Sequence, residues 1–310
     1  MVKNHKPLVS LGIPVYNESA FLEKTISSLI NQSYSDIEII AIDNNSKDSS
    51  FNILKKVSKK DKRIKIYKNN ENIGMSNNFN LVYKKSTGKY FAWIGAHDIY
   101  KEDFVENLVS KLSKTKNAAV AFVNISKIDS NGKKFDKVKD TGFDLSGNNS
   151  ILRLIKLPWV IKGSGDIVMG LFDKKALNKT TLFSNSMLWS DVFLIYQIAR
   201  LGKIIKVKEN LRYRRFFRED EKKFNNWEEK YNKITSRFRS HDQIGKNTIK
   251  ISFYFPVLLF CWKLFLEIGI KKIYNPINLI LSVYLVTLFS ITRRKAILID
   301  FKNFLRKFKV

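Results

Sequence analysis

Four apolar segments in the N-terminal half each end in residues that could bind a ligand or transfer a proton. The first, "SLGIPVYNES" at 10–19, is expected to break at Pro14, and it continues with an aromatic ring, an amide and a carboxylate. The other three end at 43–46, 72–77 and 95–98. The polar or small residues singled out in the four endings are Tyr16, Asn17, Glu18, Asp43, Asn45, Gly74, Asn77, Ala96, His97 and Asp98. Turns favour Asn, Asp and Gly, which would explain any one ending, and a helix cap would explain the first. Four endings at one edge of a sheet indicate a ligand site.

The segments that carry these residues alternate between strand and helix patterns. Strands are predicted at 8–13, 37–43, 63–69, 89–96 and 118–125, and helices at 18–32, 48–60, 75–86 and 101–113. Strands separated by helices predict an α/β fold with a mostly parallel, Rossmann-like sheet covered by helices on both faces.

The pattern is looser after residue 126. Asn131-Gly132 predicts a hairpin turn. Helices are predicted at 150–159 and 188–201. Strands are predicted at "DIVMGLF" (166–172) and, as two short strands, at "KIIKV" and "LRYRRFF".

Composition narrows the class of protein and its partners. The 310 residues hold 56 Lys and Arg against 28 Asp and Glu, a net charge of +28 that favours polyanionic partners. No nucleic-acid-binding motif is visible, so no nucleic acid is expected as a partner. The single Cys261 excludes an intramolecular disulfide and a cysteine zinc cluster. The N-terminus shows no apolar signal stretch, so secretion is not expected.

The last sixty residues differ from the rest. Segment 251–310 has ten Lys or Arg and two acids around two apolar runs, and the second run, at 276–291, is 16 residues long. A spanning helix needs about 20 residues. We therefore expect basic, apolar helices that lie in the interface of an anionic membrane. A spanning hairpin and buried packing helices are the alternatives.

Five motifs, in this order and spacing, resemble family 2 glycosyltransferases of the bacterial cell-surface glycan type. These enzymes have the GT-A fold and transfer the sugar with inversion. The motifs are "IPVYNE" at 13–18, "AIDNNSKD" at 41–48, "NIGMSNNFN" at 72–80, "KYFAWIGAHD" at 89–98 and "LWSDVFLIYQIARLGKI" at 188–204. The resemblance covers about residues 7–217. It implies a transferase domain at 1–220 and a basic, apolar, membrane-associated helical region at 221–310.

The resemblance also implies a donor site for a nucleotide-diphospho sugar, with UDP as the expected nucleotide. Asp43 would accept a hydrogen bond from a uracil N–H, and Tyr16 would pack on the ring. Glu18 would line the same pocket, although a place in the first turn of a helix would also explain it. The donor-binding residues that we expect are Pro14, Tyr16, Asn17, Glu18, Asp43, Asn45, Gly74, Asn77, Ala96 and Arg214.

The family's Asp-x-Asp metal motif is altered in this chain. Gly95 stands at the first Asp and His97 at the second, and Asp98 follows. The resemblance implies that His97 holds a divalent metal on the diphosphate, with Asp98 orienting His97 or coordinating the ion beside it. Imidazole favours Mn²⁺ over Mg²⁺ as that cofactor. In the alternative, lysines neutralise the diphosphate.

The family's catalytic base is an Asp at the start of a late helix, usually within Glu-Asp. Asp191 matches this base, and Ser190 stands in place of the Glu. A helix cap is the structural alternative for Asp191. Arg214 or Arg215 would meet the diphosphate, or they would lie on the surface.

The leading hypothesis is an inverting hexosyltransferase-like enzyme of cell-surface polysaccharide biosynthesis, on the cytoplasmic face of the membrane, with a glycan or lipid-linked acceptor. A nucleotidyltransferase would need a glycine-rich loop after the first strand, which "GIPVYNES" lacks. The changes at Gly95 and Ser190 leave a third hypothesis: a catalytically altered GT-A protein that acts as a polyanion- or membrane-binding module.

Overall fold

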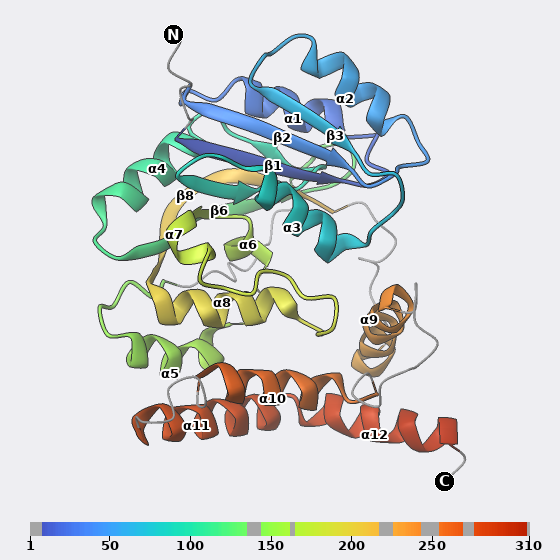
Figure 1. Cartoon of the computed structure of the whole chain (residues 1–310), viewed down its shortest axis with the longest axis vertical. Coiled ribbons are helices and arrows are strands. Elements are labelled where there is room, and N and C mark those ends of the chain that lie inside the picture. Colours follow the sequence, from blue (N-terminus) through green and yellow to red (C-terminus); the bar gives the residue numbers. More distant parts are fainter. Residues whose placement is uncertain are drawn as a thin grey trace.

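The computed structural model describes residues 8–134, 144–161, 165–216, 226–242, 254–268 and 276–308. Within these ranges a single eight-stranded sheet has the order β3-β2-β1-β4-β7-β6-β8-β5. Figure 1 shows the sheet at one end of the molecule and a layer of C-terminal helices at the other, with α8 and α5 between them. The predicted α/β class is confirmed.

The N-terminal half of the sheet is parallel. β1 (Val9–Val15) lies between β2 (Ile37–Asp43) and β4 (Tyr90–Trp93), and β3 (Ile64–Lys68) is the edge strand beside β2. β1 and β2 are almost wholly buried apolar runs, as expected for strands covered on both faces. The expected break at Pro14 is wrong, because β1 continues to Val15. The pairing of β1 with β4 stops at Gly12. Pro14, which has no backbone N–H to donate, therefore lies beyond the part of β1 that pairs with β4.

Helices connect these strands and cover the sheet. They are α1 (Leu22–Ile30), α2 (Ser50–Ser58), α3 (Met75–Lys85) and α4 (Phe104–Lys114). Each begins within four residues of its expected start, because the spacing of apolar residues fixes the buried face. Figure 1 shows α1 and α2 on the side of the sheet away from α3.

The second half of the sheet is mixed. β7 (Leu171–Asp173) is antiparallel to both β4 and β6 (Ala118–Ile128), and β5 (Ile99–Tyr100) is antiparallel to β8 (Lys203–Arg215). Two expectations are wrong here. The segment 166–172 is not one strand, because α6 (Gly165–Val168) precedes β7, and 203–215 is one strand, because β8 follows β6 through register shifts. The hairpin turn is confirmed: Gly132 has φ 88° and its N–H bonds to the carbonyl of Asp129.

The remaining helices form a second layer that shares one core with the sheet. They are α5 (Ser150–Val160), α7 (Lys174–Leu177), α8 (Ser190–Leu201), α9 (Trp227–Asp242), α10 (Pro256–Ile268), α11 (Pro276–Thr292) and α12 (Arg294–Phe308). Phe260 of α10 packs on Phe193 and Tyr196 of α8 and stacks on Phe289 of α11. The expected domain boundary at 220/221 lies outside the described residues.

Among the described helices, none alone is long and apolar enough to cross a membrane. By length and composition, α11 and α12 together pass the test for a span, but they are bent by 71° where they meet. The expectation of membrane association therefore stays a prediction.

Candidate active site

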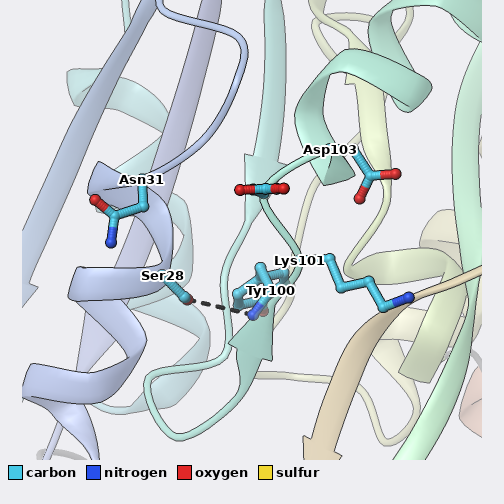
Figure 2. A pocket seen from close by; sticks show the side chains of 6 residues that line it. Ser28, Asn31, Tyr100, Lys101 and Asp103 are labelled. Atoms are coloured by element: carbon cyan, nitrogen blue, oxygen red, sulfur yellow. Dashed lines mark hydrogen bonds between the residues drawn. The ribbon is translucent and has the colours of Figure 1, made fainter.

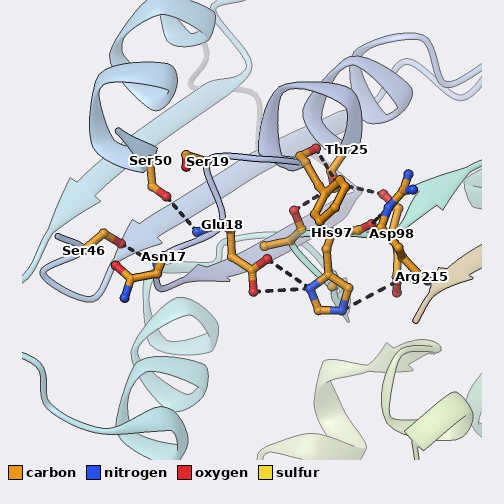
Figure 3. A network of polar contacts seen from close by, with 12 residues as sticks. Asn17, Glu18, Ser19, Thr25, Ser46, Ser50, His97, Asp98 and Arg215 are labelled. Carbon is orange, nitrogen blue, oxygen red and sulfur yellow. Dashed lines mark hydrogen bonds and ion pairs between the residues drawn. The ribbon is translucent and has the colours of Figure 1, made fainter. Parts of the chain in front are cut away.

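The turn after β1 is held by side chains from the loop after β2. Ser46 accepts a hydrogen bond from the backbone N–H of Asn17 at 2.9 Å, and Ser50 accepts one from the N–H of Glu18 at 2.8 Å. Asn17 has φ 54°, a conformation that Asn tolerates better than most residues, and its side chain accepts from the N–H of Lys47. The two loops are thus locked together, and Glu18 points along the strand ends toward His97 (Figure 3).

Asp43 carries an unsatisfied buried acceptor at the end of β2. Its side chain is fully buried, and Oδ2 accepts from the N–H of Ser46 at 3.1 Å. Oδ1 is buried and has no hydrogen-bond partner among the described residues. A buried carboxylate oxygen without a donor is costly. Asp43 therefore has one oxygen available for an N–H of a ligand, and Tyr16, 42% exposed, follows the neighbouring strand β1.

An asparagine cluster below this site was only partly foreseen. The amide of Asn44 donates to Asn72 at 2.8 Å and its oxygen accepts from Asn69 at 2.9 Å; Asn69 also donates to Asn78. These contacts fix the loop from β3 to α3. The dense run of Asn at 69–80 was the sequence signal. Two predicted ligand residues take part in local structure: Gly74, at φ 81°, precedes α3, and Asn77 donates to the carbonyl of Ile73. Asn45, at φ 59°, lies in the loop after β2.

His97 and Glu18 face each other across the ends of β4 and β1. The Nδ1 of His97 lies 3.3 and 3.2 Å from the two carboxylate oxygens of Glu18, which is 6% exposed. A carboxylate at one ring nitrogen fixes the tautomer and leaves the other nitrogen as the ligand or base atom. Here the other nitrogen is Nε2, which lies 3.9 Å from Oδ1 of Asp98, so the ring is held between Glu18 and Asp98.

Asp98 is held by two arginines of β8. Arg212 donates from Nε to Oδ2 at 2.8 Å, with a further nitrogen of its guanidinium 2.7 Å from the same oxygen; Oδ1 accepts from the backbone N–H of Arg215. Asp98 is fully buried and Arg212 is 4% exposed. Both carboxylate oxygens anchor β8 to the end of β4, and metal binding by Asp98 stays a prediction.

Gly95 makes this anchor possible. A Cβ at Gly95 would lie 2.6 Å from Oδ2 of Asp98, so any larger residue would displace the buried carboxylate. The N–H of Gly95 donates to the hydroxyl of Tyr100, and the hydroxyl of Thr25 lies within hydrogen-bond distance of the carbonyls of Ala96 and Asp98. Ala96 is thus held through its backbone. The departure from the family motif at Gly95 has a steric cause.

A divalent metal at this edge would have to use few protein ligands. The described residues contain no group of three or more His, Cys, Asp or Glu arranged to hold an ion. The predicted ligands His97 and Asp98 lie next to each other, with 3.9 Å between Nε2 of His97 and Oδ1 of Asp98. Mg²⁺ is often bound through one or two side chains and the phosphates of the substrate, and imidazole also suits Mn²⁺. Both oxygens of Glu18 face Nδ1 of His97, so an ion here would take most of its ligands from a diphosphate, and the metal stays a prediction.

Asp191 lies in the first turn of α8, after an unusual backbone. Trp189 has φ 58°, in the left-handed region, and precedes the helix directly. No side chain caps the first turn at Trp189. Figure 1 shows that the N-terminal end of α8 faces the same side of the molecule as the carboxyl ends of β1, β2 and β3. Asp191 stays the predicted base.

The two arginines proposed for the diphosphate differ. The guanidinium of Arg215 lies over Phe21 and donates to the carbonyls of His97, Asp129 and Ser130. These contacts give Arg215 a structural role. Arg214 is more exposed and lies 3.5 Å from Asp166, which leaves it as the one of the two that could reach a ligand.

A separate hollow lies behind β5 (Figure 2). It is lined by Ser28, Asn31, Tyr100, Lys101, Glu102 and Asp103. The N–H of Tyr100 donates to Ser28, so part of this lining holds α1 against β5. None of the residues predicted for the donor site lines it.

Comparison with known proteins identifies the class. Residues 10–175 match the model of glycosyl transferase family 2, and the chain belongs to this family. An uncharacterized glycosyltransferase of Haemophilus influenzae is 43% identical over 108 residues, 35% of this chain and 33% of that protein. One from Nostoc is 27% identical over 212 residues, 67% of this chain and 64% of that protein. The chain thus spans well under two thirds of one relative and just under two thirds of the other.

Solved structures share the fold. Staphylococcus aureus TarS 1-349 matches with a TM-score of 0.56 at 13% identity, over 91% of this chain and 81% of that one, and TarS 1-349 has also been solved with UDP-GlcNAc. The mannosyltransferase PcManGT of Pyrobaculum calidifontis, solved with GDP-Man and Mn²⁺, matches with a TM-score of 0.52 at 14% identity, over 92% and 86%. The GT-A fold expected from the sequence is confirmed.

Proposed function

We propose that this family 2 glycosyltransferase moves a hexose from a UDP-sugar to a glycan or lipid-linked acceptor with inversion at the anomeric carbon. The observation that carries the donor assignment is the buried Oδ1 of Asp43 at the end of β2, which has no donor among the described residues. Tyr16 follows the neighbouring strand β1. A uracil ring presents an N–H to such an oxygen. The UDP-GlcNAc complex of TarS, which shares the fold, supports this choice of nucleotide.

We assign a separate role in the reaction to each predicted site residue. Asp191, at the start of α8, takes the proton from the acceptor hydroxyl, and the activated oxygen attacks the anomeric carbon from the face opposite the diphosphate. Glu18 orients His97, and Arg214 adds positive charge near the leaving group. His97, with Asp98 beside it, would hold a Mn²⁺ ion, and the ion would supply charge stabilisation to the diphosphate.

The setting that we propose is cell-surface polysaccharide biosynthesis at the cytoplasmic face of a membrane. The basic, apolar helices α10 to α12 support a membrane-bound acceptor, because they carry exposed apolar side chains. In a catalytically altered binding module, by contrast, the chain would bind membranes or polyanions and turn over no sugar.

Binding of UDP to the purified protein tests the donor assignment. We expect UDP to raise the melting temperature, and Mn²⁺ to enlarge the shift, because a ligand that binds only the folded state stabilises it. Asp43→Asn should weaken UDP binding about tenfold, since an amide cannot offer both oxygens. Asp36→Asn, the same change just before β2, is the control. A rise in melting temperature with UDP that is the same in Asp43→Asn as in wild type, and the same with and without Mn²⁺, would contradict this donor site.

A further inference from the structure

A second cavity, of about 250 Å³, lies between α5, α8 and α11, away from the donor site. Its lining residues are Pro158, Trp159, Ile161, Tyr196, Phe289, Thr292 and Arg293. Carbon-rich side chains make its walls, and no carboxylate is among its lining residues. The cavity opens next to the break between α11 and α12.

Tyr196 contributes a buried hydroxyl beside this cavity. Tyr196 is 1% exposed, lines the cavity, and its hydroxyl has no hydrogen-bond partner among the described residues. Burial raises its pKa well above the ordinary value, so the group keeps its proton. A buried hydroxyl left unpaired costs free energy that a ligand oxygen would recover.

Arg293 adds a positive charge to the same cavity. Its guanidinium lies 5.7 Å from the ring centre of Trp189 and 5.5 Å from that of Phe289. Within the described part of the chain no acid is paired with it. A half-buried arginine between aromatic faces, close to an unpaired phenol, forms a site for an anion such as a phosphate.

The rim of the cavity is apolar and exposed. Trp159 is 65% exposed and its indole N–H donates to the hydroxyl of Tyr284 at 2.8 Å, which fixes it at the mouth. Ile291, which precedes the lining residue Thr292, is 53% exposed on the last turn of α11. A free inorganic anion would leave this apolar rim exposed to water, whereas an alkyl chain attached to the anion would bury it.

We propose that this cavity binds the phosphate of an amphiphilic lipid, with Arg293 and the Tyr196 hydroxyl on the phosphate oxygens and the chain against Trp159 and Phe289. The phosphate could belong to a prenyl-type carrier or to a glycerophospholipid, which share this chemistry. Prenyl-type binding would deepen the proposed function, because the site would then hold the lipid of the acceptor.

The cavity is linked to the predicted base through α8. Tyr196 follows Asp191 by five residues, a rise of about 7.5 Å along the helix. Trp189, under Arg293, lies two residues before Asp191. A lipid phosphate bound here would therefore place its attached group close to the N-terminal end of α8.

Binding of short, soluble lipids to the full chain tests the inference by calorimetry. We expect farnesyl phosphate or dihexanoyl phosphatidylglycerol to bind, and farnesol and inorganic phosphate to bind at least tenfold more weakly. Whichever of the two lipids binds identifies the source. Arg293→Gln should raise the Kd by about 10-fold or more and Tyr196→Phe by about 3- to 10-fold. Arg294→Gln, an equal loss of charge on an exposed neighbour, should change it less than twofold.

Tyr196→Phe separates binding from folding. Because its hydroxyl has no hydrogen-bond partner in the part of the chain that the structure describes, removing it should leave the melting temperature unchanged or higher while lipid affinity falls. Equal affinity in wild type, Arg293→Gln and Tyr196→Phe, or no binding of either lipid, would overturn the proposal. UDP binding measured on the same samples reports on the donor site, so failure of one proposal is distinguishable from failure of the other.

Discussion

Asp98 and Asp191, two acids assigned to chemistry from the sequence, have different surroundings. Asp98 is fully buried and anchored by Arg212 and the backbone of Arg215. Removing one partner of such a pair leaves a buried charge uncompensated, so substitutions at Asp98 would act on the fold. Asp191 is partly exposed in the first turn of α8. Only Asp191 is therefore suited to receive a proton from a ligand.

Asp191→Asn should lower kcat of sugar transfer by at least 100-fold, because an amide cannot accept the acceptor's proton. The Kd for UDP should stay within about twofold, since Asp191 belongs to the acceptor side. Turnover is measured with the natural sugar donor once known, and UDP affinity by calorimetry. Retained turnover would remove Asp191 as the base, and lost UDP binding would place it in the donor site.

At the scale of elements, one buried glutamate joins four parts of the sheet. Glu38 of β2 accepts from Ser10 of β1 at 2.6 Å, from Lys65 of β3 at 2.7 Å and from the N–H and hydroxyl of Thr87 before β4. Burial alone would raise its pKa, but the hydrogen bonds from Lys65, Ser10 and Thr87 outweigh it and lower the pKa to about 2. The carboxylate is thus a structural anion.

This pKa makes stability depend on pH. The folded pKa lies below the ordinary value, so the contribution of Glu38 is present above about pH 4.5 and is lost as the pH falls toward 2. Glu38→Gln should lower the free energy of unfolding by about 1–3 kcal/mol at pH 7, and by less at pH 3. Urea denaturation at both pH values measures this.

Glu23→Gln is the matched control. Glu23 pairs with Lys56 on the surface, with side chains 49% and 61% exposed, so its loss should cost under about 0.5 kcal/mol. A Glu38→Gln penalty that is the same at pH 3 and pH 7 would contradict the role of the charge.

The elements that sequence reasoning found are those with a strong local pattern. β1 to β4 and α1 to α4 follow from apolar runs and helical spacing. The pairing of β5 with β8, and the placement of Asp98 against Arg212, depend on residues 114 positions apart, which no local pattern encodes. For the same reason the anchoring of Asp98 could not be predicted, because the guanidinium that contacts its Oδ2 comes from a distant strand.

At the scale of the whole molecule, α12 has an exposed apolar face bordered by basic residues. Leu298, Phe301 and Leu305 are 67%, 47% and 44% exposed on α12, and their spacing of three and four residues puts them on one face. Exposed Lys295, Lys302 and Arg306 border this stripe. In Figure 1, α11 and α12 form the outer layer of the molecule opposite the sheet. An apolar stripe bordered by cations is typical of helices that lie in a membrane interface.

The whole-chain double substitution Leu298→Gln, Phe301→Gln should reduce binding to vesicles of mixed phosphatidylcholine and phosphatidylglycerol at least tenfold in co-sedimentation, because both side chains would leave the apolar phase. The full chain is needed, since α10 and α11 complete the core around α8 and a truncation near residue 250 would expose Phe193 and Tyr196. Binding should also weaken as salt rises, because the charge contribution is screened.

The control is Tyr67→Gln on the edge strand β3, a comparably exposed ring on another part of the molecule. It should leave vesicle binding within twofold. If the double variant binds vesicles as wild type does but loses a concentration-dependent dimer in sedimentation, the stripe is an interface between two copies of the chain. If both variants bind equally and remain monomeric, the contact with membranes lies elsewhere, and the apolar rim around Trp159 and Ile291 becomes the surface to change next.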